Sequence, residues 1–580
     1  MSDLKQVPAS ASRDVWMTRA LLVGLCVVAF GRSVTSPLVN WDDHLYLDAA
    51  LNPTIVPSWN SFVQMWTEIH MNDAYHPLHL LSYWIDVPWF GATGPVTHTT
   101  NLIFWVLIVL GLQRAFVKLG LSLFAATVAA AVYAVHPASV EAVAWTSARK
   151  DLLALAFGVL ALHAHLDAKN YRDPAAWRAA FFVVCAVLSK ATAVALPVAF
   201  IALDLWCSRR PLREAVVLQL PALAVCLPLG ALVTSVRIDH EMIYGLGPNA
   251  PERGWQIIPA SLTHYLRTSF FPDALSPLYP LERDVPSTAL QIIAGPVAIA
   301  ASVYAAWQVR TQSSKHALIG AGLLVFLVFF TPVSNILAIY LQWGDRYLVW
   351  MHVGLALTLG ALVDVFGPTK PDWRHALVAA VLVVPLTVRS VQYCEVWSND
   401  LRLFSHATSV QPNAYFAWLK LAEVRRDGGD YVGAMNAASR AMEVSPLQPL
   451  PHAAFLTSLA LRDERRAELT PSQAIEHANT FLRSMNDADQ LRALASTMRD
   501  AGYRDAMLYV LGRSFDVSPV RNDQLEHATA VQLREGNLWL ARFYLSRMTE
   551  RPLSPVVTQF FESELRRNGL PVPTELPTGR

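Results

Sequence analysis

Charged residues are scarce in this sequence. Only 16% of the 580 residues are Asp, Glu, Lys or Arg, whereas 53% are hydrophobic, and the mean hydropathy is +0.32. The net charge of +1 leaves no basic excess that would attract a nucleic acid. This composition is too apolar for one soluble domain, so it predicts an integral membrane protein without a nucleic-acid partner.

Cysteine pairs and the common nucleotide and hydrolase motifs are also lacking. The five Cys residues show no spacing typical of a disulfide framework or a zinc site. The sequence contains no GxxxxGK[ST], no GxGxxG before a helix, no HExxH and no GxSxG. ATP-driven transport, dinucleotide chemistry and the common hydrolase mechanisms therefore have no support.

Long apolar runs, by contrast, recur through the first 396 residues. About eleven of them approach the ~20 residues that a membrane-spanning helix needs. They cover residues 15–34, 99–117, 121–136, 150–166, 176–189, 191–206, 215–236, 288–309, 317–338, 347–366 and 375–392. We therefore expect an all-α fold, with residues 1–396 forming a polytopic bundle of membrane helices.

Two stretches depart from ordinary spans. Residues 176–206 are too long for one span and too short for two, and Lys190 lies in their middle. Basic clusters on both sides favour a short, kinked hairpin there. Residues 255–271 are interrupted by Pro259, His264 and Arg267, so we expect an interfacial helix.

The basic residues indicate an orientation. The first loop, residues 34–98, contains six acidic residues and no Lys or Arg, whereas alternate loops further along are basic. The positive-inside rule then places the acidic loop outside and the N-terminus in the cytoplasm. Eleven spans would place the C-terminus outside. Only eight of the 46 basic residues are Lys, which is typical of a GC-rich bacterial genome. We therefore expect a bacterial inner membrane, with the C-terminal region in the periplasm.

From residue 397 the pattern changes to amphipathic helices. Seven residues match the positions of a 34-residue tetratricopeptide repeat, namely Trp418, Leu421, Ala422, Ala434, Ala438, Ala441 and Pro446. Weaker matches follow at Ala474, Ala478, Phe481, Ala506 and Ala541. Residues 397–580 are therefore expected to form an α-solenoid, whose concave face usually binds an extended peptide. A stabilising cap or an assembly surface is the alternative.

An acidic pair follows the first span. Asp42 and Asp43 lie in the loop that has no basic residues. A carboxylate near a membrane surface can act as a general base or ligate a divalent cation. A solvated pair that caps a short helix is the other interpretation.

Two histidines follow in the same loop. His76 and His79 are three residues apart and would share a helix face, so a metal site is conceivable. Histidine, Tyr and Trp at this depth more often form an aromatic belt. The sequence leaves the metal unknown.

Further charged and polar residues lie at the outer ends of three later spans. A charged group beside a span is costly unless it faces water or a polar cavity. Together they would suit a phosphate-bearing lipid held by cations beside a carboxylate. Interfacial anchoring and interhelical salt bridges are the alternative. The residues are His136, Glu141, Arg149, Lys150, Lys190, Asp345, Arg346 and Tyr347.

The ordered set of these segments resembles a known family. After the acidic pair come HPLHLLSYW, HTTNLIFW, VHPASVEAVAWTSARKDLL, SKATAVALPVAFIALDLW, GDRYL, WSND and PNAYFAWLKLAE. The chain resembles the transmembrane and tetratricopeptide-repeat-containing O-mannosyltransferases, within the GT-C glycosyltransferase superfamily, over nearly its whole length. The resemblance implies a polyprenyl-phosphate-linked sugar donor and transfer, with inversion, to Ser or Thr hydroxyls of periplasmic proteins that the repeats bind.

The resemblance also implies residue roles. Asp42 matches the catalytic base, with Asp43 as its competitor, and Glu141 matches a second acidic position that orients the acceptor or binds a divalent metal. Arg149, Lys150, Lys190 and Arg346 would bind the lipid phosphate. Accessory or acceptor contacts would come from His76, His79, His136, Asp345 and Tyr347. Transfer to a glycolipid or polysaccharide, and a non-catalytic membrane scaffold, are the competing functions.

Overall fold

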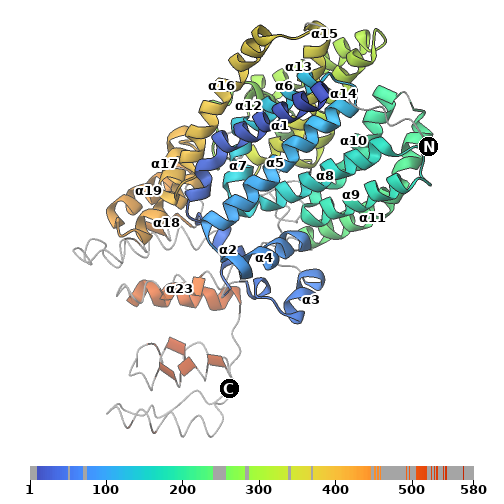
Figure 1. The fold of residues 1–580 in the computed structure, drawn as a ribbon. Helices are drawn as coiled ribbons and strands as arrows, with labels where there is room; N and C mark the ends of the chain where they lie inside the picture. Colours follow the sequence, from blue (N-terminus) through green and yellow to red (C-terminus); the bar gives the residue numbers. More distant parts are fainter. Residues whose placement is uncertain are drawn as a thin grey trace. The chain divides into compact units, whose positions relative to one another are not determined.

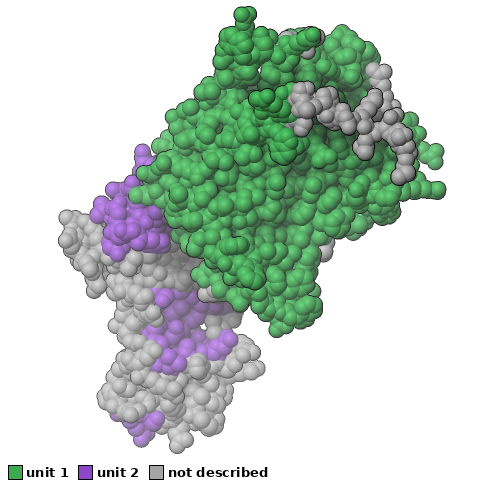
Figure 2. Space-filling view, viewed as in Figure 1, with its two compact units in different colours: residues 1–414 green, residues 415–580 purple. Residues whose placement is uncertain are grey.

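A computed structural model describes most of the chain, and every regular element in the described part is helical. This confirms the expected all-α class. The chain divides into two compact units, residues 1–414 and 415–580 (Figure 2). The predicted division after residue 396 precedes α17, which belongs to the first unit. The described residues are 9–49, 52–68, 75–208, 210–239, 256–280, 287–336, 341–367, 370–445 and 504–518, with short stretches between 450 and 566.

The first unit is a bundle of long helices with a layer of short helices at one end (Figure 1). The short helices of the first loop are α2 (Asp43–Leu47), α3 (Trp59–Thr67) and α4 (Pro77–Phe90). The other helices are α1 (Ala9–Phe30), α5 (Gly94–Lys118), α6 (Leu123–Ala134), α7 (Val140–Ala144), α8 (Arg149–Asp167), α9 (Pro174–Ser189), α10 (Leu196–Leu203), α11 (Leu212–Asp239), α12 (Ile257–Phe270), α13 (Ala289–Val309), α14 (Ser314–Phe330), α15 (Leu348–Phe366), α16 (Trp373–Val396) and α17 (Asp400–Val410).

Several of these helices are long and apolar enough to cross a membrane. Among the described residues seven qualify by length and composition, namely α1, α5, α11, α13, α14, α15 and α16. The pair α6 and α7, bent by 55° at the break before Pro137, makes an eighth if it is one span. A multi-pass membrane protein is therefore supported. The expected total of eleven stays a prediction, because α8 begins with three charged residues and because α9 and α10 are short.

The remaining predicted elements also have helical counterparts. α9 ends at Ser189, a 3-10 turn covers Ala191–Ala195, and α10 follows, so the expected break at Lys190 is present. The expected interfacial helix corresponds to α12. Its depth in a membrane stays a prediction.

Glycine permits one unusually close crossing between helices. A Cβ on Gly322 of α14 would meet the carbonyl oxygen of Gly354 on α15, and a Cβ on Gly354 would meet that of Gly322. Small residues let membrane helices approach in this way. The α14–α15 pair is therefore tightly packed, and the 3-10 turn Asp345–Tyr347, which carries Arg346, directly precedes α15.

The connections separate into two sets at opposite ends of the bundle. At one end Lys118 and Asp167 form an ion pair at 2.8 Å, and Lys315 lies 3.4 Å from Asp364. These contacts join loops that the sequence marks as basic. At the other end the loop after α1 contacts the segment between α7 and α8, as described below. The expected sorting of the loops is thus visible, while their assignment to cytoplasm and periplasm stays a prediction.

The second unit contains α18 (Tyr415–Asp427), α19 (Tyr431–Val444) and α23 (Arg504–Val517) in its described part. α18 and α19 pack together through small buried residues, including Ala422, Ala434, Ala438 and Ala441. Gly429 in the turn has a φ of 81°, which glycine adopts without strain. This helical pair fits one repeat. Pro446, Ala474, Ala478, Phe481 and Ala541 lie outside the described residues, as does the side chain of Ala506, so the solenoid stays a prediction.

Candidate functional site

The first acidic loop folds into a layer with a core of its own. Buried apolar side chains from α2, α3, α4 and their connections pack together, namely Tyr46, Leu47, Ile55, Met65, Leu80 and Tyr83. A segment with such a core holds its polar side chains in fixed positions. The residues predicted for chemistry in this loop are therefore placed by packing.

Asp43 is enclosed and serves as an anchor. Its side chain is fully buried, and Oδ1 accepts hydrogen bonds from the Ser147 amide at 2.9 Å and the Ser147 hydroxyl at 2.6 Å. Oδ2 accepts a third from the Val39 amide at 3.0 Å. Burial raises the pKa of this carboxyl to about 6, against the lowering effect of the three donors. Asp43 thus ties the first loop to the segment before α8.

Asp42 lies in different surroundings. Its side chain is partly exposed, and it makes no hydrogen bond or ion pair with any described residue. It precedes α2 without capping it, so the helix-capping interpretation does not apply to Asp42. Its charge interacts with that of Lys150. Of the two predicted carboxylates, Asp42 is the one available to a substrate.

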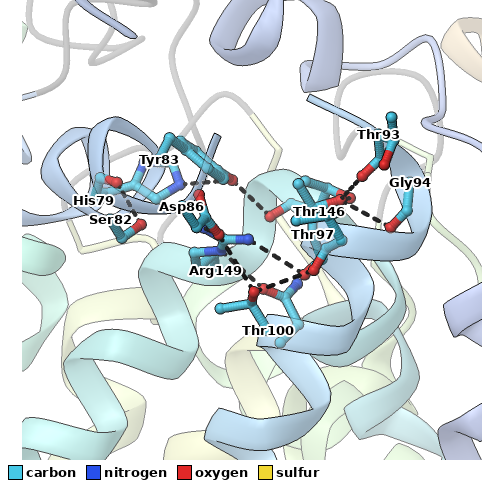
Figure 3. A network of polar contacts seen from close by, with 12 residues as sticks. His79, Ser82, Tyr83, Asp86, Thr93, Gly94, Thr97, Thr100, Thr146 and Arg149 are labelled. Carbon is cyan, nitrogen blue, oxygen red and sulfur yellow. Dashed lines mark hydrogen bonds and ion pairs between the residues drawn. The ribbon is translucent and has the colours of Figure 1, made fainter. Parts of the chain in front are cut away.

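Arg149 is held inside the protein by several partners (Figure 3). Its guanidinium donates to Asp86 Oδ2 at 2.6 Å, to Asn101 Oδ1 at 3.1 Å and to the Thr97 carbonyl at 3.3 Å. Its Cζ atom also lies 4.3 Å from the ring centre of Tyr83. The side chain has no exposed surface. For Arg149 the interhelical salt bridge, which the sequence offered as an alternative, is what the structure contains.

The two predicted histidines belong to an aromatic cluster. The rings of His76 and His79 are 5.0 Å apart, and both pack against Tyr46. His79 Nε2 lies 3.1 Å from the Tyr83 hydroxyl, which in turn donates to the Thr146 carbonyl at 2.8 Å. Burial, followed by neighbouring positive charges, lowers the pKa of His79 well below its usual value. The two histidines therefore belong to a buried aromatic cluster, which agrees with the aromatic interpretation.

Three cations gather beside this layer. Lys150, Lys190 and Arg346 lie close enough for their charges to interact, and aromatic rings separate them. Tyr347 lies between Lys190 and Arg346, with ring-centre distances of 5.3 and 4.8 Å. Trp145 lies between Lys150 and Arg346, at 5.9 and 5.1 Å. Three like charges at such separations repel one another, so a nearby negative charge stabilises the cluster.

Two of these cations already have a carboxylate partner. Arg346 pairs with Glu141, whose Oε2 also accepts from the Arg346 amide at 2.9 Å, and Lys190 pairs with Asp151. Lys150 makes no ion pair with a described residue; its Nζ lies 3.4 Å from the Tyr46 hydroxyl. The positive charge of Lys150 is therefore the least compensated of the three.

The other predicted residues support this arrangement from its edges. Asp345 is buried and accepts from Tyr279 at 2.6 Å, from the Ser276 amide at 3.2 Å and from Tyr393 at 3.3 Å. It therefore anchors the turn that carries Arg346. His136 accepts from the Ala138 amide and packs against His352 at 4.2 Å, in the break between α6 and α7. We place His136 outside the cation cluster.

Sequence reasoning assigned no site role to several residues that build the site. Asp86, Asn101 and Ser147 hold Arg149 or Asp43, and Asp151 pairs with Lys190. Asp151 offered a signal, because it directly follows two basic residues at the start of an apolar run. The other three lie in segments whose long-range partners no local pattern indicates.

No metal centre is evident in the described part of the chain, where no three His, Cys, Asp or Glu side chains come together in a suitable group. Comparison with known proteins also gives no assignment. No protein-family model matches the chain, and no curated protein is significantly similar to it. The proposal below therefore depends on the geometry of the site and on the resemblance of its motifs.

Proposed function

We propose that this chain is a membrane glycosyltransferase of the GT-C type, which transfers a hexose such as mannose from a polyprenyl-phosphate donor to Ser or Thr hydroxyls of periplasmic proteins. One observation supports it most strongly. An unpaired, partly exposed carboxylate, Asp42, lies near Lys150, which belongs to a cluster of three cations.

The carboxylate is suited to the part of a general base. The Asp42 carboxylate makes no hydrogen bond with any described residue, so a hydroxyl group can approach it without displacing a described partner. In the proposed reaction Asp42 takes the proton of the acceptor hydroxyl. The oxygen of that hydroxyl attacks the anomeric carbon of the sugar at the same time. The bond between that carbon and the donor phosphate oxygen breaks, and the configuration inverts.

The cation cluster is suited to the leaving group. Negative charge builds up on the departing lipid phosphate, and fixed cations stabilise that charge more in the transition state than in the ground state. Lys150 would make the most direct contact, because it forms no ion pair with a carboxylate among the described residues. Arg346 and Lys190 would add their charge from positions fixed by Glu141 and Asp151. Arg149 is omitted, because its guanidinium is fully buried and occupied.

The test uses a strain that lacks the gene. It is complemented with the wild type, with Asp42→Asn, or with Glu68→Gln, which alters an exposed carboxylate of the same loop. Mass spectrometry then measures hexose-bearing Ser and Thr peptides from the periplasm and membrane. We expect the modification to return with the wild type and Glu68→Gln. With Asp42→Asn the rate should fall about 10²–10⁴-fold, which is typical for loss of a general base.

The controls separate the competing functions. All proteins are matched for expression and thermal stability. If the peptides are identical in every strain, transfer to protein is refuted, and envelope glycolipids are measured next. If glycolipids are also unchanged, the chain is no glycosyltransferase and the scaffold function remains.

A further inference from the structure

A groove runs along the outside of the bundle between α1, α5 and α8, and none of the residues proposed to act in the reaction lines it. α5 packs against α1 and against α8. The groove has a volume of about 800 Å³, and its walls are mostly apolar. Trp16, Leu107 and Leu160 among its lining residues are 68%, 57% and 44% exposed. We call this the α1–α5–α8 groove.

One end of this groove is basic. Arg19 lies in the first half of α1, Arg114 lies near the end of α5, and His163 lies near the end of α8. The Lys118–Asp167 ion pair joins the same ends of α5 and α8, so these three residues lie toward the basic loops. The described residues of the lining include no Asp or Glu.

The basic groups lack anionic partners. Neither Arg19 nor Arg114 makes an ion pair with a described residue, and Arg19 Nε is buried without a hydrogen bond. His163 Nε2 lies 2.9 Å from the Gly111 carbonyl, and its buried Nδ1 has no partner. Arginines within apolar helices are costly unless a counter-charge is present. Gln113 of α5 donates to Thr18 of α1 at 3.1 Å, which holds α1 in place beside the groove.

We propose that the α1–α5–α8 groove binds one glycerophospholipid with an anionic headgroup. Its acyl chains lie along Trp16, Leu107 and Leu160, and its phosphate contacts Arg19 and Arg114. The volume fits the size of a small-molecule site, and anionic lipids are drawn to clustered basic residues at a membrane surface. This inference is independent of the proposed function, because Arg19 and Arg114 take no part in the proposed reaction and no residue proposed to act in it lines the groove.

The test measures lipid retained by the full-length protein. Protein is reconstituted in nanodiscs that contain equal amounts of phosphatidylglycerol and phosphatidylethanolamine, and native mass spectrometry counts bound lipids after release. We expect the wild type to retain one phosphatidylglycerol. The double variant Arg19→Gln/Arg114→Gln should retain it about tenfold less. Arg172→Gln/Arg374→Gln removes the same charge from basic-end residues outside the groove, and it should bind as the wild type does.

A second variant tests the proposal in case the double arginine variant does not fold. Ala156→Phe fills the groove and leaves both arginines in place, and it should also lower retention. The proposal is overturned if phosphatidylethanolamine is retained equally by the wild type. It is also overturned if the charge control loses as much phosphatidylglycerol as the groove variants, or if Ala156→Phe retains as much as the wild type.

Discussion

Asp42 and Asp43 are adjacent in the sequence, yet their carboxylates face different surroundings. Successive positions at the start of a helix point about 100° apart, as follows from 3.6 residues per turn. Asp43 therefore points inward to Ser147, whereas Asp42 remains partly exposed. The sequence predicted a functional carboxylate at this point but did not indicate whether it is Asp42 or Asp43. The local geometry of α2 supplies the distinction.

The raised pKa of Asp43 predicts a pH dependence of stability. The folded protein holds this proton more tightly than the unfolded chain, since the pKa rises from 3.8 to about 6. The resulting stabilisation is fully present below pH 3.8 and is lost as the pH rises through 6. Asp43→Asn removes this component, so the difference in unfolding temperature between wild type and variant should change across that window.

Thermal unfolding in detergent from about pH 4 to pH 7 measures this difference. Glu68→Gln, which alters an exposed carboxylate of the same loop, is measured alongside as the control. A parallel pH profile for Asp43→Asn and the wild type would mean that Asp43 titrates at its ordinary pKa.

At the scale of elements, α17 connects to the loop that carries Asp42. Asp400 Oδ1 accepts a hydrogen bond from the Asn40 amide at 2.6 Å, and Phe404 stacks on Trp41 with ring centres 5.8 Å apart. Trp41 also packs edge-on against Trp145, which lies beside the cation cluster, with ring centres 5.9 Å apart. α17 therefore positions the backbone directly before Asp42.

This contact predicts a kinetic effect from outside the site. Asp400→Ala should slow sugar transfer by roughly tenfold to a hundredfold, because a small displacement of a catalytic group is costly. Asp400→Asn keeps the accepting oxygen and should restore most of the rate. Leu401→Ala changes an exposed neighbour on α17 and should have no effect. Rates of glycopeptide formation in membranes measure this. Equal rates for Asp400→Ala and Asp400→Asn would show that the hydrogen bond from α17 does not position Asp42.

At the scale of the whole molecule, the two compact units meet in sequence at residues 414 and 415. A chain that ends at residue 414 keeps the bundle, α17 and the cation cluster. If the second unit recruits the acceptor protein, this chain should remain folded in detergent and lose most periplasmic glycopeptides. Size-exclusion chromatography tests whether the shortened chain remains folded, and glycopeptide mass spectrometry measures the loss of glycopeptides. Undiminished glycopeptides would show that the second unit does not select the acceptor.

The sequence by itself determined the all-α class, the apolar helices, the break at Lys190 and the sorting of acidic and basic loops. These follow from hydropathy and charge, which act over neighbouring residues. Only the tertiary structure decided which charged side chains are available to contact a ligand. Arg149 is enclosed by Asp86 and Asn101, from sites 63 and 48 residues away, whereas Lys150, the next residue, makes no ion pair with any residue that the structure describes. Such partnerships depend on which helices pack together, and a local pattern does not contain that information.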